Sequence, residues 1–119
     1  MPLSLKNLTF DCENAAELAA FWSAVLGRPV DPDPTEFFAM IGPQGAEGEP
    51  TYMFIKVPES KTTKNRCHPD FHSSERVAEV ERIKALGAKH LGDFDEYGMQ
   101  WSTLADPEGN EFDIGQDPS

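Results

Sequence analysis

The chain has 119 residues, 39% of them hydrophobic, which suits one domain with a single core. Ten basic residues stand against 21 acidic ones, so the formal net charge is −11 at pH 7. This charge argues against nucleic acid and anionic membrane surfaces as partners, because both would repel the protein. It is compatible with a cationic small-molecule ligand, or with a charge that serves solubility alone.

The sequence shows no run near the ~20 apolar residues that a membrane span needs. Its first residues lack a basic leader followed by an apolar stretch, so we expect no signal peptide and a cytoplasmic location. Two cysteines, Cys12 and Cys67, make a poor disulfide framework, and in the cytosol both would stay reduced.

The first elements in chain order are a strand and a helix. Residues 5–12 alternate between apolar and polar side chains, which predicts a half-buried strand. Asn14 is followed three residues later by Glu17, the pattern of a capping box at a helix start. Gly27 and Pro29 end this helix, because glycine suits the left-handed closing position and proline prevents continuation. Its apolar stripe consists of Leu18, Phe21, Trp22, Val25 and Leu26.

After a turn at 31–34, two further strands are predicted at 36–42 and 51–57, and residues 43–50 between them read as a flexible loop. The stretch 61–72, KTTKNRCHPDFH, then gathers three of the ten basic residues and two of the three histidines. It raises three alternatives: a metal site, an anion site, or a polar linker that runs into a strand.

The second half starts with an alternating segment, residues 68–73, in which His68, Asp70 and His72 share one face. A helix follows, capped by Ser73 or Ser74 and ended at Gly87. The predicted apolar stripe of this helix consists of Val77, Val80, Ile83 and Leu86.

After that helix, residues 88–94 are predicted to form a short strand or a turn, and two further strands are predicted at 99–105 and 110–114. The sequence DPEG at 106–109 is typical of a type I turn, with Asp first, Pro second and Gly last.

The order of elements repeats at an offset of about 60 residues. Gly27 matches Gly87 at offset 60 and Phe10 matches Phe71 at offset 61, which also places Asn7 opposite His68. We therefore predict an α+β fold of two βαβββ modules that form a curved mixed sheet, with helices outside and a central cup. The single domain spans 1–119, divided into module one at 1–58, a linker at 59–67 and module two at 68–119.

Three segments together resemble a known family: LTFDCENAAELAAFWSAVLG, KTTKNRCHPDFH and LADPEGNEFDI. They resemble the vicinal oxygen chelate superfamily, also called the glyoxalase/bleomycin resistance/dioxygenase fold, and most of all its small bacterial glyoxalase-like domains. The resemblance covers essentially the whole chain.

In metal-using members of that superfamily, four cup positions hold a divalent ion. Carried over to this chain, they fall at Asn7, at Ile55 or Lys56, at His68 and at Asp113. Only His68 and Asp113 are good ligands, and two of four rarely hold an ion with useful affinity. The resemblance thus implies a divalent metal cofactor that the residues present do not favour.

His68 has two further interpretations besides that of a ligand. It is a general base, with Asp113 or Asp70 as its partner, or a structural histidine bonded to Asp70, Asp113 or Asn7. His72 reads as a surface histidine more readily than as a ligand. We take His68 and Asp70 as the catalytic candidates.

The remaining candidates are ligand-binding residues. Lys64, Asn65 and Arg66 precede the strand, where they would reach an anionic ligand group or, more readily, pair with carboxylates of this acidic chain. Trp101 faces either the cup, where it would stack on a flat or cationic ligand, or the core. Asp11, Asp70, Glu111 and Asp113 would give the cup a negative lining. The candidate set for ligand binding is Asn7, Thr9, Asp11, Arg66, His72, Trp101 and Glu111.

Three functions remain open at this point. The first is a glyoxalase-like lyase or isomerase of unknown substrate that uses His68. The second is a non-catalytic binder, similar to bleomycin resistance proteins, that holds a small ligand, either cationic or neutral, in a dimer groove. The third is an interaction module whose cup is filled by its own side chains. A homodimer is expected, because single-chain members of the superfamily usually pair.

Overall fold

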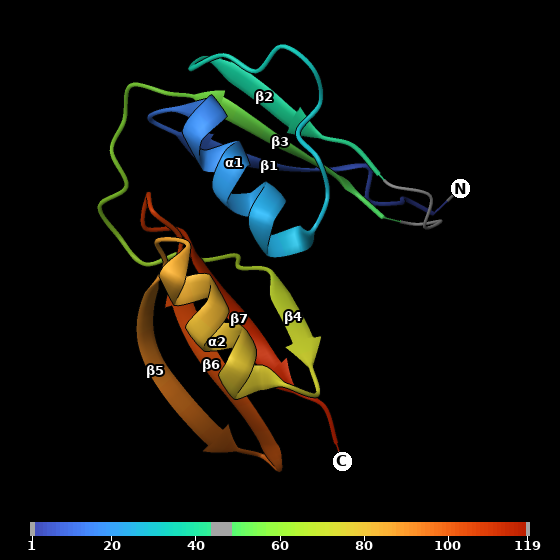
Figure 1. The fold of residues 1–119 in the computed structure, drawn as a ribbon, viewed down its shortest axis with the longest axis vertical. Coiled ribbons are helices and arrows are strands. Elements are labelled where there is room, and N and C mark those ends of the chain that lie inside the picture. The colour runs from blue at the N-terminus through green and yellow to red at the C-terminus, as the bar shows by residue number, and fades with distance from the viewer. Residues whose placement is uncertain (1, 44–48, 119) are drawn as a thin grey trace. The chain divides into compact units, whose positions relative to one another are not determined.

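The computed structural model describes residues 2–43 and 49–118. The chain divides into two compact units, Met1–Ser60 (unit 1) and Lys61–Ser119 (unit 2). Within the described residues each unit holds one helix and one sheet, which confirms the predicted α+β class (Figure 1). The boundary between the units falls inside the predicted linker at 59–67. The single domain over 1–119 stays a prediction.

Unit 1 is a sheet of three strands with one helix. Its elements are β1 (Asn7–Cys12), α1 (Ala15–Leu26), β2 (Phe38–Ile41) and β3 (Thr51–Lys56). The strand order is β1-β3-β2, with β1 parallel and β2 antiparallel to β3. Helix α1 packs against β2 and β3.

Unit 1 thus has one described strand fewer than the βαβββ pattern that we predicted for each half. The segment at 28–37 runs between α1 and β2 without forming a strand. It contains Pro29, Pro32 and Pro34, which lack the backbone N–H that a ladder needs. Most of the predicted loop at 43–50 lies outside the described residues.

The core of unit 1 is a cluster of aromatic rings. The Phe10 ring lies 5.1 Å from that of Trp22 and 5.4 Å from that of Phe54, measured between centroids. Trp22 and Phe54 are fully buried, and Tyr52 is almost so. This packing confirms the predicted core role of Trp22 on the helix.

Both predicted ends of α1 are confirmed. The Asn14 side-chain oxygen accepts a hydrogen bond from the Glu17 backbone N–H at 3.0 Å, which satisfies one of the free donors of the first turn. Gly27 closes the helix with φ of 68°, and its N–H donates to the Ser23 carbonyl at 2.9 Å.

Unit 2 has the full βαβββ arrangement. Its elements are β4 (Asp70–Ser73), α2 (Arg76–Ala85), β5 (Lys89–Glu96), β6 (Met99–Ala105) and β7 (Glu111–Gln116). The strand order is β4-β7-β6-β5, with β4 parallel to β7 and the other neighbours antiparallel.

Helix α2 differs from the prediction at its start and along its stripe. Its N-cap is Glu75, whose side chain makes no capping bond to any described residue, and Ser73 instead accepts from the Glu75 N–H at 2.9 Å. Val80 and Ile83 are buried as predicted, but Val77 is 65% exposed and Leu86 40% exposed. A spacing of three residues drifts by about 60° per step around a helix, so the two ends of the stripe leave the core face.

The predicted turn at 106–109 fixes the register of β6 and β7. The Gly109 N–H donates to the Asp106 carbonyl at 2.9 Å, and the buried Asp106 carboxylate accepts from the backbone N–H groups of Glu108 and Asn110. As a result Ala105 lies opposite Glu111, and Thr103 lies opposite Asp113.

The internal repeat holds at the level of register. Phe10 pairs with Phe54 in the parallel ladder of unit 1, and Phe71 pairs with Ile114 in that of unit 2. The counterpart of Asp113 is therefore Met53, and the assignment of that position to Ile55 or Lys56 is wrong. A methionine thioether is a poor ligand for hard divalent ions, so the conclusion that unit 1 lacks this ligand still holds.

No helix among the described residues is long and apolar enough to cross a membrane. Cys12 is buried and Cys67 is exposed, and neither forms a disulfide with a described residue.

Candidate functional site

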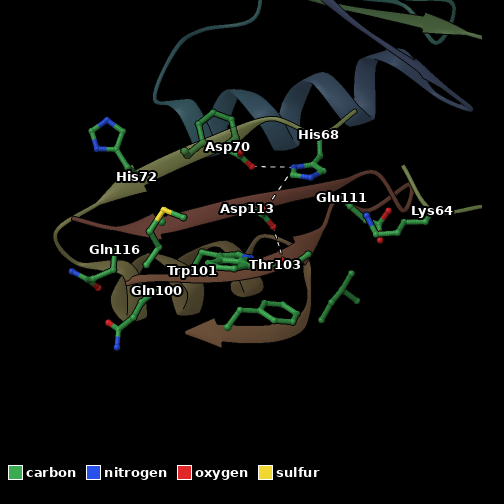
Figure 2. A pocket seen from close by; sticks show the side chains of 15 residues that line it. Lys64, His68, Asp70, His72, Gln100, Trp101, Thr103, Glu111, Asp113 and Gln116 are labelled. Carbon is green, nitrogen blue, oxygen red and sulfur yellow. Dashed lines mark hydrogen bonds and ion pairs between the residues drawn. The ribbon is translucent and has the colours of Figure 1, made fainter. Parts of the chain in front are cut away.

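Unit 2 contains a cavity of about 720 Å³. It lies over the sheet face that carries alternate residues of β6 and β7, whereas the intervening residues Ser102, Leu104, Phe112 and Ile114 are buried (Figure 2). The polar part of its lining comprises Lys64, His68, Asp70, His72, Gln100, Thr103, Glu111, Asp113 and Gln116. The apolar part comprises Phe71, Leu91, Phe94, Met99 and Trp101.

The polar part centres on His68. Its Nδ1 lies 3.0 Å from Asp70 Oδ1 and 3.5 Å from Asp113 Oδ2, because Asp70 and Asp113 are paired neighbours on β4 and β7 (Figure 2). One imidazole N–H can serve both carboxylates, and a protonated ring would be stabilised by both. This confirms the hydrogen-bonded interpretation of His68, and it leaves the other ring nitrogen available for chemistry.

Asp113 is the most enclosed carboxylate of the cluster, with a side chain 17% exposed against 66% for Asp70. Burial raises the pKa of Asp113, and the nearby Asp70 raises it further. The Thr103 hydroxyl donates to Asp113 Oδ1 at 2.6 Å, and this bond together with His68 lowers the pKa in part. The carboxylate is thus held in one orientation but lacks full charge compensation.

The apolar part is organised by a stack of two rings. Phe94 on β5 lies opposite Trp101 on β6, with ring centroids 5.4 Å apart and planes inclined by 20°. Trp101 is half-buried and lines the cavity, so of our two interpretations the cup-facing one holds and core packing does not. Figure 2 shows Trp101 beside Thr103, below Asp113.

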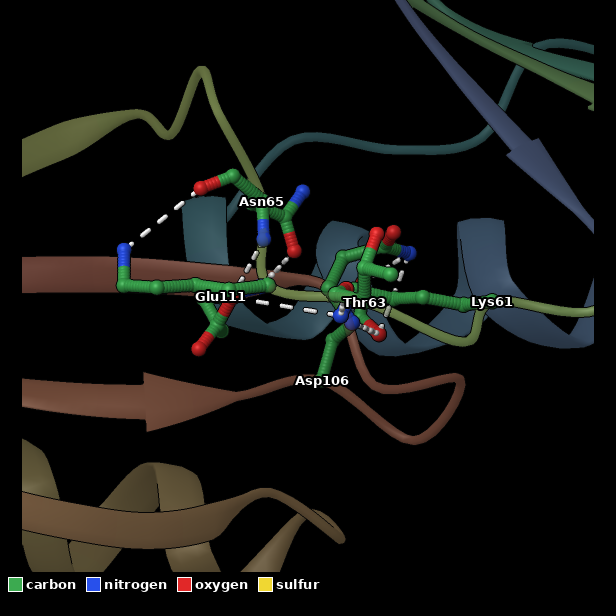
Figure 3. Close-up of polar contacts among 7 residues, drawn as sticks. Lys61, Thr63, Asn65, Asp106 and Glu111 are labelled. Atoms are coloured by element: carbon green, nitrogen blue, oxygen red, sulfur yellow. Dashed lines mark hydrogen bonds and ion pairs between the residues drawn. The ribbon is translucent and has the colours of Figure 1, made fainter.

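The basic stretch before β4 is anchored by Glu111. The Asn65 backbone N–H donates to Glu111 Oε1 at 2.7 Å, and the Glu111 N–H donates to Asn65 Oδ1 at 3.1 Å (Figure 3). Lys61 Nζ lies 3.9 Å from Glu111 Oε1 and also donates to the Thr63 carbonyl. The stretch is therefore a linker paired with a carboxylate, and it delivers His68 and Lys64 to the cavity.

Two other predicted site residues of unit 2 are not members of the His68 cluster. His72 lines the cavity, is 81% exposed and contacts Asp117 through Nδ1 at 2.8 Å, as expected of a surface histidine. Arg66 is exposed and is not among the described residues that line the cavity. The three candidates of unit 1, Asn7, Thr9 and Asp11, are exposed on β1, and their role in ligand binding stays a prediction.

Thr103 and Phe94 line the cavity but were missed by the sequence reasoning. The signal for Thr103 was present, since it lies two residues from Trp101 on one strand and the 106–109 turn sets its register against Asp113. Phe94 carried a weaker signal, because a bulge between His90 and Gly92 shifts the register of β5.

A second polar cluster lies on the opposite face of the sheet. The Arg76 guanidinium donates to the buried Ser102 hydroxyl at 2.6 Å, and that hydroxyl donates to Asp93 Oδ1 at 2.6 Å. His90 Nε2 lies 2.8 Å from the same oxygen. The bonds from Ser102 and His90 lower the pKa of Asp93. This cluster ties α2 to β5 and β6 directly behind Trp101 and Thr103.

Comparison with known proteins gives one family. A family model described as a glyoxalase-like domain matches residues 7–115. No curated protein matches the sequence. A glyoxalase/bleomycin resistance protein/dioxygenase family enzyme from Burkholderia phytofirmans PsJN has a similar structure, with 19% identity and a TM-score of 0.76 over 96% of this chain and 98% of that one.

Two further solved structures are similar. A fosfomycin resistance protein, FosX, from Listeria monocytogenes, complexed with Mn(II) and 1S,2S-dihydroxypropylphosphonic acid, shares 18% identity with a TM-score of 0.78 over 99% and 93% of the two chains. A lactoylglutathione lyase from Agrobacterium tumefaciens shares 14% identity with a TM-score of 0.69 over 98% and 95%. At these identities the structures show the fold, and they confirm the glyoxalase/bleomycin resistance/dioxygenase fold that we predicted.

Proposed function

Because this chain belongs to the glyoxalase-like domain family, we propose that it is a lyase or isomerase that acts on a small organic molecule in the cavity of unit 2. The observation that carries the proposal is the His68–Asp70–Asp113 cluster in a cavity that also has an apolar wall of stacked rings. Perturbed ionisable groups in a concave apolar site are the usual mark of a catalytic centre.

The chain's own residues support proton transfer. With its proton on Nδ1, His68 donates to Asp70 and presents Nε2 as a base. A proton taken from the substrate creates an imidazolium beside two carboxylates, which stabilises that state. Thr103 fixes Asp113 in place, and the stacked rings of Phe94 and Trp101 exclude water from one wall of the cavity.

The family also implies a divalent metal, and the donor set of unit 2 fits one. His68, Asp70 and Asp113 each offer a ligand atom, and these atoms lie within 4.8 Å of one another. One imidazole nitrogen and two carboxylate oxygens suit ions such as Mn²⁺ or Fe²⁺, and the Thr103 bond is the kind of support that orients a ligating carboxylate. When an ion is bound, these three residues would hold it in place of the His68–Asp70 hydrogen bond, and it would supply Lewis-acid polarisation of a substrate oxygen. Asp70 is the third donor of this set, and the sequence alone had placed it among the catalytic candidates and the acidic lining but not among the metal ligands.

The first experiment is metal content by mass spectrometry on the purified protein, followed by thermal melts after chelation and re-addition of Ni, Zn, Mn or Fe. We expect a stoichiometric ion that is lost in His68→Ala and Asp113→Ala, and retained in Asn7→Ala, the matched position of unit 1. With that ion loaded, lyase and isomerase substrates are screened, and His68→Ala is expected to abolish turnover while the protein stays folded. If His68→Ala and Asp113→Ala alter neither ion uptake nor turnover, the proposal fails.

A second candidate function is a non-catalytic binder of a cationic ligand, at a groove of a homodimer. It is favoured by the charges of the cavity lining, where three carboxylates (Asp70, Glu111 and Asp113) are opposed by Lys64 when His68 and His72 are neutral. Such a binder should lose affinity for a cationic ligand in roughly 1 M salt, where the Debye length falls to about 3 Å. An affinity that is unchanged by salt contradicts this candidate.

A further inference from the structure

Gly115 is an unexplained glycine in the middle of β7. It lines the cavity and lies directly opposite Trp101 in the β6–β7 ladder. Glycine inside a strand costs stability, because it packs no side chain and loses more chain entropy on folding. Such a glycine therefore needs a local reason.

Neither the backbone nor the packing supplies that reason. Gly115 is not among the described glycines with positive φ, so its conformation is open to any residue. A Cβ added there would meet the Phe71 carbonyl oxygen at 3.5 Å, which is an ordinary contact. The absence of a side chain instead affects the shape of the cavity, because at Gly115 only the backbone lines its floor.

The wall beside this bare floor is the face of the Trp101 indole that points away from Phe94. Phe94, which stacks on one face of the indole, comes from β5. The strand order β7-β6-β5 places Gly115 on the other side of Trp101 from Phe94. The second face of the indole is thus turned toward Gly115, and the two residues form a slot with a flat wall and a flat floor.

The matching position in unit 1 has no such slot. There Ile55 takes the place of Gly115 and lies opposite Phe38 on β2. A branched side chain covers the strand where unit 2 leaves it bare. The slot is therefore a property of unit 2 and not of the repeated fold.

We propose that this slot binds a planar ring, aromatic or conjugated, stacked on Trp101 above Gly115. The inference rests on the proposed function only in that the ligand enters this cavity. Flat faces stack on an indole with offset geometry, which a puckered ring cannot match. Asp113 lies two residues along β7 on the same face, so the polar group of the ligand falls about 7 Å from the ring.

Two probes with the same amine and linker test the slot, one with a flat ring and one with a puckered, more apolar ring. They are 3-phenylpropylamine and 3-cyclohexylpropylamine, titrated in EDTA and followed by the NMR signals of the Gly115 amide and the Trp101 indole N–H. We expect the flat probe to bind about three- to tenfold tighter, the range that aromatic stacking adds beyond buried area. In Trp101→Leu, which keeps an apolar wall, this preference should disappear.

Filling the floor is the sharper test. Gly115→Val should lower the affinity for the phenyl probe by at least about tenfold, and Gly115→Ala should lower it by less, because the added methyl groups occupy the space of the ring. A general apolar cavity would instead bind more tightly with each added methyl. Gly42→Ala, a glycine without positive φ outside the cavity lining, is the matched control and should change nothing.

Equal binding of the two probes, or tighter binding in Gly115→Ala, overturns the slot. Either result leaves the proposed function standing, because ion uptake and turnover are tested at His68 and Asp113. If ion uptake and turnover are absent but the protein still prefers the phenyl probe, the proposed function fails while the slot stands. Gly115→Ala serves if Gly115→Val fails to fold, as judged by its NMR spectrum.

Discussion

The two units repeat one fold but present different chemistry on the same sheet positions. When the two repeats are aligned by their strand registers, three positions correspond: Asn7 to His68, Met53 to Asp113 and Met40 to Thr103. Unit 1 carries an amide and two thioethers where unit 2 carries an imidazole, a carboxylate and a hydroxyl. The two units therefore share a fold, whereas the His68 cluster and the cavity described above are features of unit 2.

Truncation of a core residue should have the largest effect on the free energy of unfolding, and the effect should be similar in both units, since each has a well-packed core. Phe54 and Phe112 are each fully buried, and truncation to alanine should lower the free energy of unfolding by about 3–5 kcal/mol. Each unit contains one tryptophan, so fluorescence of Trp22 reports unit 1 and that of Trp101 reports unit 2 in denaturant melts. A cost below about 1 kcal/mol in either variant would show that the core of that unit is not closed as described.

The next effect tests whether the carboxylate of unit 2 depends on its partners. Met53→Asp places a half-buried carboxylate opposite the Met40 thioether on β2, where unit 2 has the Thr103 hydroxyl, and with an amide, Asn7, at the His68 position. Thr9 on β1 occupies the position of Asp70, so we expect a loss of stability in unit 1 of about 1–3 kcal/mol. Adding Met40→Thr rebuilds the counterpart of the Thr103 bond and should recover part of that loss. If Met53→Asp is neutral in denaturant melts, the polar partners of Asp113 are not what makes its position tolerable.

How far the sequence predicted this difference depends on the kind of information needed. The offset of 60 to 61 residues identified the fold, and the pairing of Asn7 with His68 followed from it. The equivalence of Met53 and Asp113 could not be predicted in this way. Alternation along a strand fixes the face on which a residue lies but not the register of the partner strand. A slip of two residues keeps the face and changes the partner, and Ile55 lies two residues from Met53 on the same face of β3.

The helix of unit 2 shows the same limit in another form. Its apolar residues at intervals of three predicted a stripe, but the buried arc is narrow and admits only Val80 and Ile83. Cavity residues such as Thr103 and Gly115 carry no hydrophobic signal at all. They become meaningful only when strands far apart in the sequence are placed side by side.

A smaller effect separates the two helix starts. Asn14 caps α1 through its side chain, so Asn14→Ala should cost about 1 kcal/mol of stability in unit 1. Glu75 makes no capping bond with any described residue, and Glu75→Asp should gain up to about 1 kcal/mol in unit 2, because a shorter carboxylate reaches the free N–H groups. The midpoints of the two tryptophan transitions measure both. A loss in Glu75→Asp would mean that the backbone at this start cannot accept a cap.

The smallest effect is a pH dependence in which two carboxylates of unit 2 act with opposite signs. Burial raises the pKa of Asp113, so its ionisation costs stability, and this cost appears as pH rises from the unfolded value of about 3.9 through the higher folded value. Asp113→Asn keeps an oxygen for Thr103 and should be more stable than the parent at neutral pH, with the gain fading in acid. The bonds from Ser102 and His90 lower the pKa of Asp93, so its contribution is present at neutral pH and is lost as pH falls through the folded value. Asp93→Asn should therefore lose stability at neutral pH.

Trp101 fluorescence in urea melts across the acid range, with EDTA present, measures both variants. Met53→Asn, the unit 1 counterpart of Asp113→Asn, should show no gain that depends on pH, because it removes no carboxylate. If Asp113→Asn and Asp93→Asn shift stability in the same direction at neutral pH, the two faces of the unit 2 sheet do not differ in charge compensation. If the two variants shift stability in opposite directions, only the carboxylate on the cavity face lacks charge compensation. A ligand or an ion in the cavity can then supply that compensation.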